Sequence, residues 1–113
     1  AADSSTVTIK KEALADALAA DLPKEVQGFI VAGHKPEPLA PFQGKVTLSD
    51  AAFGSVPRSY VFTTADRAVT PSLQQQLVAA WPNTKTASLA TGHLPFLSQP
   101  QAFVNALLDL TTR

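Results

Sequence analysis

The sequence contains no cysteine and only two histidines, at positions 34 and 93. The absence of cysteine excludes disulfides, thiolate nucleophiles and thiolate metal sites, and two histidines so far apart do not have the spacing of metal ligands. The apolar runs are also short, well below the roughly 18 residues that a membrane-spanning helix needs. We therefore expect a soluble protein with no membrane contact, no metal and no other cofactor.

Charge of one sign is also lacking, because 9 basic residues balance 9 acidic ones. The chain therefore has no basic field for nucleic acid or anionic lipid, and a small neutral molecule is the expected partner. With 45% hydrophobic and 16% charged residues over 113 positions, the composition is that of one folded domain. The start, Ala1–Ser5, has no basic and apolar signal region, and the compartment stays open.

The first third of the chain is expected to contain one short strand and two helices. Alternation predicts a strand at Thr6–Ile9, and Ala- and Leu-rich sequence predicts a helix over Lys11–Leu22, ended by the proline that follows. A second helix is predicted over Lys24–Ala32, ended by glycine. The proline-rich segment Pro36–Pro41 predicts a stiff connector that is neither helix nor central strand.

The remainder predicts a βαβ unit. Arg58–Thr64 is β-branched and aromatic, and Thr84–Ala90 is a second, less apolar strand candidate. Between them, Thr70 is the expected N-cap of a helix that begins at Pro71. The apolar face of this helix is expected to carry Leu73, Leu77, Val78 and Trp81, the last as a core residue. Strands joined in this way are parallel when they share a sheet, which makes the fold class α/β.

A short helical turn is predicted before this unit and a last helix after it. Ser49-Asp50 is expected to cap a helical turn that runs through Phe53 and stops at Gly54. Ser98 is expected to cap the last helix, whose apolar side repeats at helical spacing in Phe103, Leu107 and Leu110.

Asp66 and His93 are the candidate site residues, because they follow the two predicted strands by two and three residues. The carboxyl ends of parallel strands share one edge, and neighbouring strands lie about 4.8 Å apart, which brings the two side chains within hydrogen-bonding reach. An acid in this position holds an imidazole in one tautomer and stabilises its protonated form. The alternatives are that Asp66 is a solvated turn residue and that His93 is a loop residue without a role.

The segments around both residues resemble a known family. Phe62–Pro71 (FTTADRAVTP) and Thr91–Pro100 (TGHLPFLSQP) resemble the end of α/β-hydrolases that include plant methyl-ester esterases, hydroxynitrile lyases and bacterial relatives. The stretch by which bacterial members return from the cap to the sheet is similar to three segments, Leu39–Phe42, Val46–Leu48 and Phe53–Arg58. Thr6–Pro36 resembles the later part of the cap. The resemblance implies the C-terminal portion of an α/β-hydrolase fold, with residues 1–41 in the cap and connector and 42–113 in the core.

The same resemblance implies that Asp66 and His93 are the acid and histidine of a Ser-His-Asp triad. No Gly-x-Ser-x-Gly elbow is present, since Ser55 lies between Phe53 and Pro57 and precedes the wrong strand. The serine and the rest of the parallel sheet are therefore expected on an N-terminal half, carried by a second polypeptide or by a missing segment of the same one. The family's usual aspartate before the histidine is Gly92 in this chain.

The predicted activity is hydrolysis of a small carboxylic ester by the complete protein, since this chain alone lacks the nucleophile. The lyases carry lysine directly after the histidine, whereas this chain has Leu94, which favours an esterase and is expected to contact the substrate. The alternatives are a hydroxynitrile lyase and a non-catalytic protein that binds a small molecule in the hydrolase pocket. His34 has no acid or nucleophile pattern around it and is predicted to be a surface residue.

Overall fold

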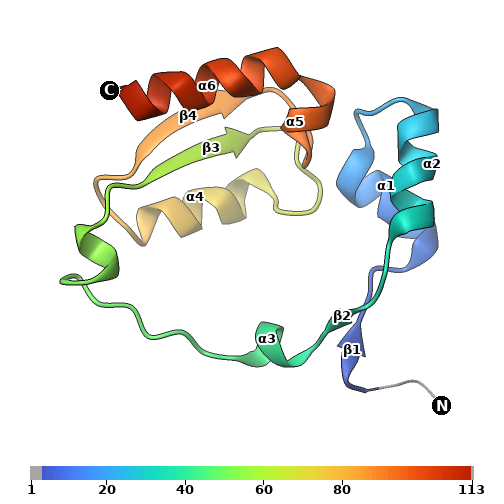
Figure 1. The fold of residues 1–113 in the computed structure, drawn as a ribbon, viewed down its shortest axis with the longest axis horizontal. Helices are drawn as coiled ribbons and strands as arrows, with labels where there is room; N and C mark the ends of the chain where they lie inside the picture. The colour runs from blue at the N-terminus through green and yellow to red at the C-terminus, as the bar shows by residue number, and fades with distance from the viewer. Residues whose placement is uncertain (1–3, 113) are drawn as a thin grey trace.

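The computed structural model describes residues 4–112 (Figure 1). In the N-terminal region, α1 (Lys11–Ala19) and α2 (Lys24–Gly33) form a helical hairpin. The hairpin is flanked by β1 (Thr6–Val7) and β2 (Glu37–Pro38), which pair as a small antiparallel sheet. Since the hairpin is the only large element between the two short strands, residues 4–38 form one local unit.

The helical hairpin has a small apolar centre made of Leu14, Ala19 and Leu22. The first helix ends at Ala19 rather than at the predicted Leu22, because the chain turns and the Leu22 N–H bonds the Ala19 carbonyl at 3.0 Å. The Gln27 amide donates to the carbonyls of Ala19 and Leu22, at 2.8 and 3.1 Å. A side chain of α2 therefore binds the last carbonyl of α1 and one carbonyl of the turn that follows it.

The prediction for the proline-rich connector is wrong in part. Glu37–Pro38 pairs with β1 as an edge strand, where proline is tolerated because its position does not need to donate an N–H. Ala40–Gln43 forms the short helix α3, and Pro41 lies in its first turn. Proline is tolerated there because the first N–H groups of a helix have no partner inside the helix.

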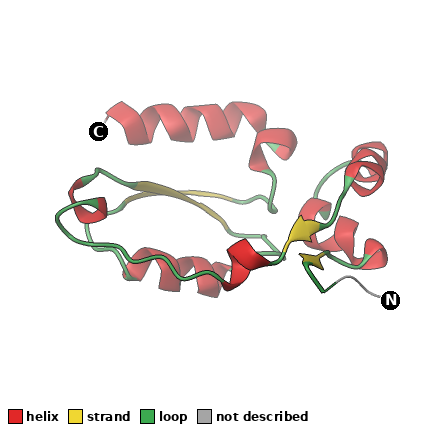
Figure 2. Ribbon diagram, turned by 60° about the horizontal axis from the view of Figure 1, so that its bottom comes forward, coloured by secondary structure: helices red, strands yellow, loops and turns green. Residues whose placement is uncertain are grey.

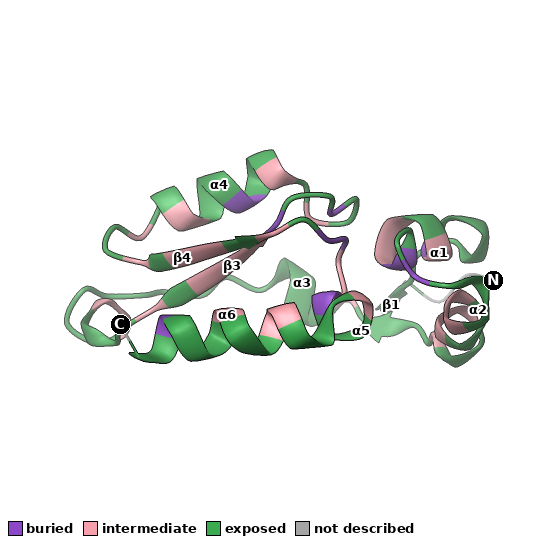
Figure 3. Ribbon diagram, turned by 90° about the horizontal axis from the view of Figure 1, so that it is seen from above, coloured by how far each residue is buried: buried purple, intermediate pink, exposed green. Residues whose placement is uncertain are grey.

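The C-terminal region is built on two parallel strands. β3 (Ser59–Thr63) pairs with β4 (Lys85–Leu89), and α4 (Pro71–Ala79) connects them. The helices α5 (Pro95–Ser98) and α6 (Pro100–Thr112) follow, and α4 and α6 lie on opposite faces of the strands (Figures 1 and 3). The predicted βαβ unit and the α/β fold class are confirmed.

The chain reaches β3 through a long loop and a single 3₁₀ turn, η1 (Phe53–Ser55) (Figure 2). Gly54 lies inside this turn and does not stop it as predicted, while the Ser49 hydroxyl does accept a bond from the Ala52 N–H at 3.1 Å. Arg58 fixes the turn to the rest of the fold, since its guanidinium lies over the rings of Phe53 and Trp81. It also donates to the carbonyls of Phe53, Gly54, Val56 and Pro82.

Two predictions about the C-terminal helices need correction. In α4, Leu73 and Leu77 are exposed and the buried side chain is Gln74, whereas Val78 and Trp81 of the same predicted face are half-buried and Trp81 packs against Phe53. The last helix begins at Pro100, and Ser98 does not cap it. Ser98 closes the preceding short helix, where its hydroxyl donates to the Leu94 carbonyl at 3.4 Å.

Candidate active site

The pairing of the two parallel strands continues into the loops that follow them. Thr63 lies opposite Leu89 in the register, and beyond it the Thr64 N–H bonds the Leu89 carbonyl at 3.0 Å. One step further, the Ala65 N–H bonds the Thr91 carbonyl at 2.9 Å. Backbone hydrogen bonds therefore hold the two loops together up to the residues next to Asp66 and Gly92.

Asp66 and His93 meet where this pairing ends. His93 Nδ1 lies 3.0 Å from Asp66 Oδ2 and 3.2 Å from Oδ1, so the predicted contact is confirmed. Asp66 is only 6% exposed, which excludes the alternative of a solvated turn acid. The His93 side chain remains 30% exposed and is therefore reachable from outside.

The Asp66 carboxylate receives further hydrogen bonds from its own loop. Thr63 Oγ1 donates to Oδ2 at 2.8 Å, and the backbone N–H groups of Ala68 and Val69 donate to Oδ1 at 2.8 and 3.0 Å. Burial raises the pKa of Asp66, but the hydrogen bonds from His93, Thr63 and the two backbone groups outweigh it, and the pKa lies below its ordinary value. Asp66 is consequently ionised at neutral pH.

The ionised carboxylate determines the tautomer of the histidine. A carboxylate only accepts hydrogen bonds, so the proton of a neutral His93 lies on Nδ1, and Nε2 carries the lone pair. Within residues 4–112, Nε2 has no hydrogen-bond partner. The pair therefore presents a proton acceptor backed by a negative charge, which is the arrangement that general-base chemistry requires.

A second layer of the site, which sequence reasoning missed, lies beneath the aspartate. Gln74 is 1% exposed, and its amide binds both backbone groups of Thr63: Oε1 accepts from the N–H at 2.9 Å, and Nε2 donates to the carbonyl at 3.0 Å. Nε2 also lies 2.7 Å from the Val69 carbonyl. One side chain thus holds both the end of β3 and the loop that wraps around Asp66.

The other candidate residues lie elsewhere or have roles that the geometry leaves open. Leu94 follows His93, is half-buried and stands at the start of α5, and its contact with a substrate stays a prediction. Ser55 lies in η1, before β3 and therefore at the opposite end of the strand from Asp66, and its hydroxyl donates to the Ala52 carbonyl at 2.7 Å. It cannot serve His93 as a nucleophile.

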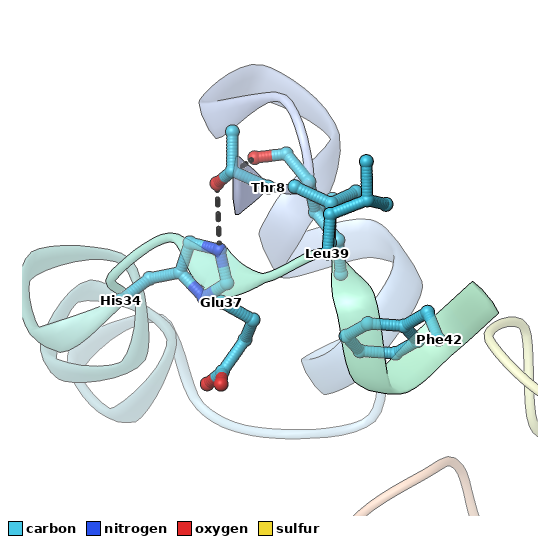
Figure 4. A pocket seen from close by; sticks show the side chains of 7 residues that line it. Thr8, His34, Glu37, Leu39 and Phe42 are labelled. Atoms are coloured by element: carbon cyan, nitrogen blue, oxygen red, sulfur yellow. Dashed lines mark hydrogen bonds between the residues drawn. The ribbon is translucent and has the colours of Figure 1, made fainter. Parts of the chain in front are cut away.

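His34, predicted to be a surface residue, is partly exposed and lies in the N-terminal region. Its Nε2 lies 3.0 Å from Thr8 Oγ1 (Figure 4). The two border an apolar cavity of about 310 Å³ together with Val7, Ile9, Glu37, Leu39 and Phe42. None of these residues belongs to the loops of Asp66 and His93.

Two further properties concern the whole of the described chain. Residues 4–112 hold no group of three or more histidine, aspartate or glutamate side chains placed to bind a metal ion. In the same residues, no helix combines the length and the apolar character that crossing a bilayer demands.

The chain is similar to known proteins over nearly its whole length. Residues 3–106 match the model of the Alpha/beta hydrolase family. The chain is 33% identical over 105 residues to the putative methylesterase 11, chloroplastic, of Arabidopsis thaliana, a match that covers 92% of this chain and 27% of that protein.

Solved structures give the same picture. A crystal structure of a methylesterase from Arabidopsis superposes with a TM-score of 0.86 at 26% identity, over 96% of this chain and 47% of the other. Polyneuridine aldehyde esterase superposes with a TM-score of 0.83 over 94% of this chain and 43% of the other, and its 21% identity carries the fold alone. The chain spans less than half the length of each of these three proteins.

Proposed function

Because the chain belongs to the alpha/beta hydrolase family, we propose that it supplies the acid and the histidine of a Ser-His-Asp triad in a hydrolase of small carboxylic esters. Asp66 is the orienting acid, and His93 is the general base and then the general acid. The observation that carries the proposal is the contact between buried Asp66 and His93 at the ends of two paired parallel strands.

The proposed reaction needs a serine from outside these 113 residues. His93 Nε2 takes the proton of the serine hydroxyl while the oxygen attacks the ester carbonyl, and it returns the proton to the departing alcohol. Asp66 keeps Nδ1 protonated throughout and stabilises the imidazolium that forms between the two steps. Water then releases the acid from the serine, with His93 again as the base.

The proposed substrate class is the methyl ester of a small carboxylic acid. The relatives named as methylesterases support it, and so does the absence of any net charge that would favour an ionic substrate. Leu94, directly after the histidine, offers an apolar wall for the acyl or alcohol group, and we propose that it contacts the substrate. The resemblance implies that a hydroxynitrile lyase would carry lysine at position 94, where this chain has leucine.

The proposal extends to the organisation of the complete protein. We assign residues 1–41 to the cap and its connector and residues 42–113 to the core, and we assign the serine and the remaining strands to a second polypeptide. The sheet of β3 and β4 has two strands, and parallel sheets are stable when several strands are paired and both faces are covered. Such a polypeptide would extend the sheet and complete the triad.

The test is covalent labelling of the chain together with the polypeptide that purifies with it. A fluorophosphonate should modify one serine outside residues 1–113, located by intact mass, and a small methyl ester should be cleaved to the acid and methanol. Substituting His93→Ala in this complex should prevent both reactions. Release of cyanide from a cyanohydrin would point instead to a lyase, and ligand binding without labelling or turnover would point to a receptor.

A further inference from the structure

The turn between α1 and α2 reaches the loop that carries His93. Asp21, in this turn, accepts a hydrogen bond from the Gly92 backbone N–H with 2.7 Å between Oδ2 and the nitrogen. The two residues are 71 positions apart, so the bond joins the helical hairpin to the residue directly before the histidine. Figure 1 shows α1 beside the loops that follow β3 and β4.

The geometry also explains why position 92 is glycine. A Cβ placed on Gly92 would lie 2.6 Å from Asp21 Oδ1 and 3.1 Å from its Cγ, so any side chain would displace the carboxylate. No described glycine has a positive φ, so backbone conformation is not the reason for this one. The resemblance described above leads one to expect an aspartate at position 92, and in this chain a carboxylate arrives at the same place from the hairpin.

The backbone N–H of Gly92 depends on Asp21 as its hydrogen-bond acceptor. Gly92 is buried, and its N–H would be left without an acceptor if Asp21 moved away. Hydrogen bonds from backbone N–H groups to a carboxylate are stronger than those to neutral acceptors. Asp16, on α1, also contacts the site region through an ion pair with Arg67, but both side chains are more than half exposed, and water screens that pair.

We propose that Asp21 is a positioning residue for His93. By accepting the hydrogen bond of the Gly92 N–H, its carboxylate fixes the backbone next to His93. The imidazole then keeps its orientation, with Nδ1 hydrogen-bonded to Asp66 and Nε2 pointing away from it. The consequence for turnover rests on the function proposed above, whereas the structural consequence does not. A shift of about 1 Å in a catalytic group is enough to cost on the order of 100-fold in rate.

The test compares Asp21→Ala with Asp21→Asn, which keeps an oxygen acceptor, and with Asp16→Ala as the matched loss of a nearby carboxylate. In the active complex, Asp21→Ala should lower kcat by roughly 10- to 100-fold with little change in KM. Asp21→Asn should recover most of the loss, and Asp16→Ala should leave kcat at the wild-type level. Equal kcat values for Asp21→Ala and Asp16→Ala would overturn the proposal.

A double-mutant cycle tests the contact itself. Gly92→Ala should lower kcat in the wild-type background, because the new methyl displaces the carboxylate, and should add little in the Asp21→Ala background, where the space is free. Additive losses would overturn the proposal. If Asp21→Ala does not fold, Asp21→Ser, which also vacates the space beside Gly92, takes its place in the cycle and in the comparison of kcat.

Nuclear magnetic resonance separates this inference from the proposed function. Asp21→Ala should shift the Gly92 amide proton upfield and broaden the His93 Nδ1 proton through exchange with water, and Asp21→Asn should do neither to the same extent. This result supports the positioning role even if His93→Ala retains turnover, in which case only the proposed function fails. Unchanged resonances in Asp21→Ala, with His93→Ala inactive, would reject the positioning role and leave the proposed function intact.

Discussion

The region around Asp66 and His93 buries polar side chains, whereas the outer faces of the chain expose apolar ones. The loops enclose polar groups, namely Thr63, Asp66, Gln74 and Thr91, and Asp66 and Gln74 have several hydrogen bonds each. On the outer faces, by contrast, large apolar side chains are open, with Phe29 71% and Val46 81% exposed. The hydrogen bonds of Asp66 and Gln74 are therefore formed within these residues, whereas the exposed apolar side chains lack a partner among them.

The dimensions of the chain agree with this contrast. Its radius of gyration is 16.4 Å, against about 13 Å for a compact domain of the same length. Patches of exposed apolar surface mark interaction sites in many proteins. The comparison therefore supports the proposed second polypeptide, which would cover the outer faces without having to build the Asp66–His93 pair.

The largest effect is expected from a change inside the polar region. In the active complex, Asp66→Asn should lower kcat by something on the order of 10⁴-fold, since an amide permits the wrong tautomer of His93. Steady-state kinetics on a small methyl ester measures this, with thermal unfolding as the control for folding. A loss of less than tenfold would mean that Asp66 does not orient the histidine during turnover.

The apolar region makes its own prediction, which concerns association. We expect the isolated chain not to remain a monomer, because its exposed apolar faces and unpaired strand edges favour contact with other chains. Size-exclusion chromatography with mass detection reads this directly. A monodisperse 11.9 kDa monomer with a cooperative unfolding transition would show that the outer faces need no cover.

A smaller effect is expected from the layer beneath the aspartate. Gln74→Leu leaves the buried N–H of Thr63 without its acceptor, which should lower the free energy of unfolding by about 1–3 kcal/mol. Gln75→Leu, on the exposed side of the same helix, is the matched control and should change little. Denaturant unfolding of the active complex compares the two, and equal losses would contradict the positioning of Thr63 by Gln74.

The mildest effect is a dependence of stability on acid pH. Because the pKa of Asp66 is lowered in the folded state, its ionised form stabilises the fold above the unfolded-state pKa of about 4. This stabilisation should be lost as the pH falls through the folded pKa, and Asp66→Asn should lack this part of the acid sensitivity. The free energies of unfolding of the wild type and of Asp66→Asn are compared from pH 6 down through the folded-state pKa. The same pH dependence in both proteins would show instead that the carboxylate gains nothing from its hydrogen bonds.

Sequence reasoning found the parts of the site that depend on local order. Asp66 and His93 follow two strands of recognisable composition, and parallel pairing must bring such strand ends to one edge. The central residues of both strands were predictable from composition, since β-branched and aromatic residues are concentrated in them. The helix ends were less predictable, because α1 ends at Ala19, whose carbonyl binds Gln27 of another helix, three residues before Leu22.

The supporting residues could not be predicted, because their signal lies in tertiary contacts. Gln74 belongs to a run of three glutamines, and only packing against β3 decides that it is the buried one. Asp21 binds a backbone group 71 residues away, in a loop whose position depends on the whole C-terminal region. Gly92 before the histidine was visible as a departure from the family pattern, and it was the one sequence signal of that contact.

The role of His93 is tested most directly by the turnover of a small methyl ester by the active complex carrying His93→Ala. We expect turnover and fluorophosphonate labelling both to be lost, while the unfolding curve and the assembly of the complex stay close to those of the wild type, because the His93 side chain is partly exposed. Turnover at the wild-type rate in this variant would contradict the assignment of His93 as the general base.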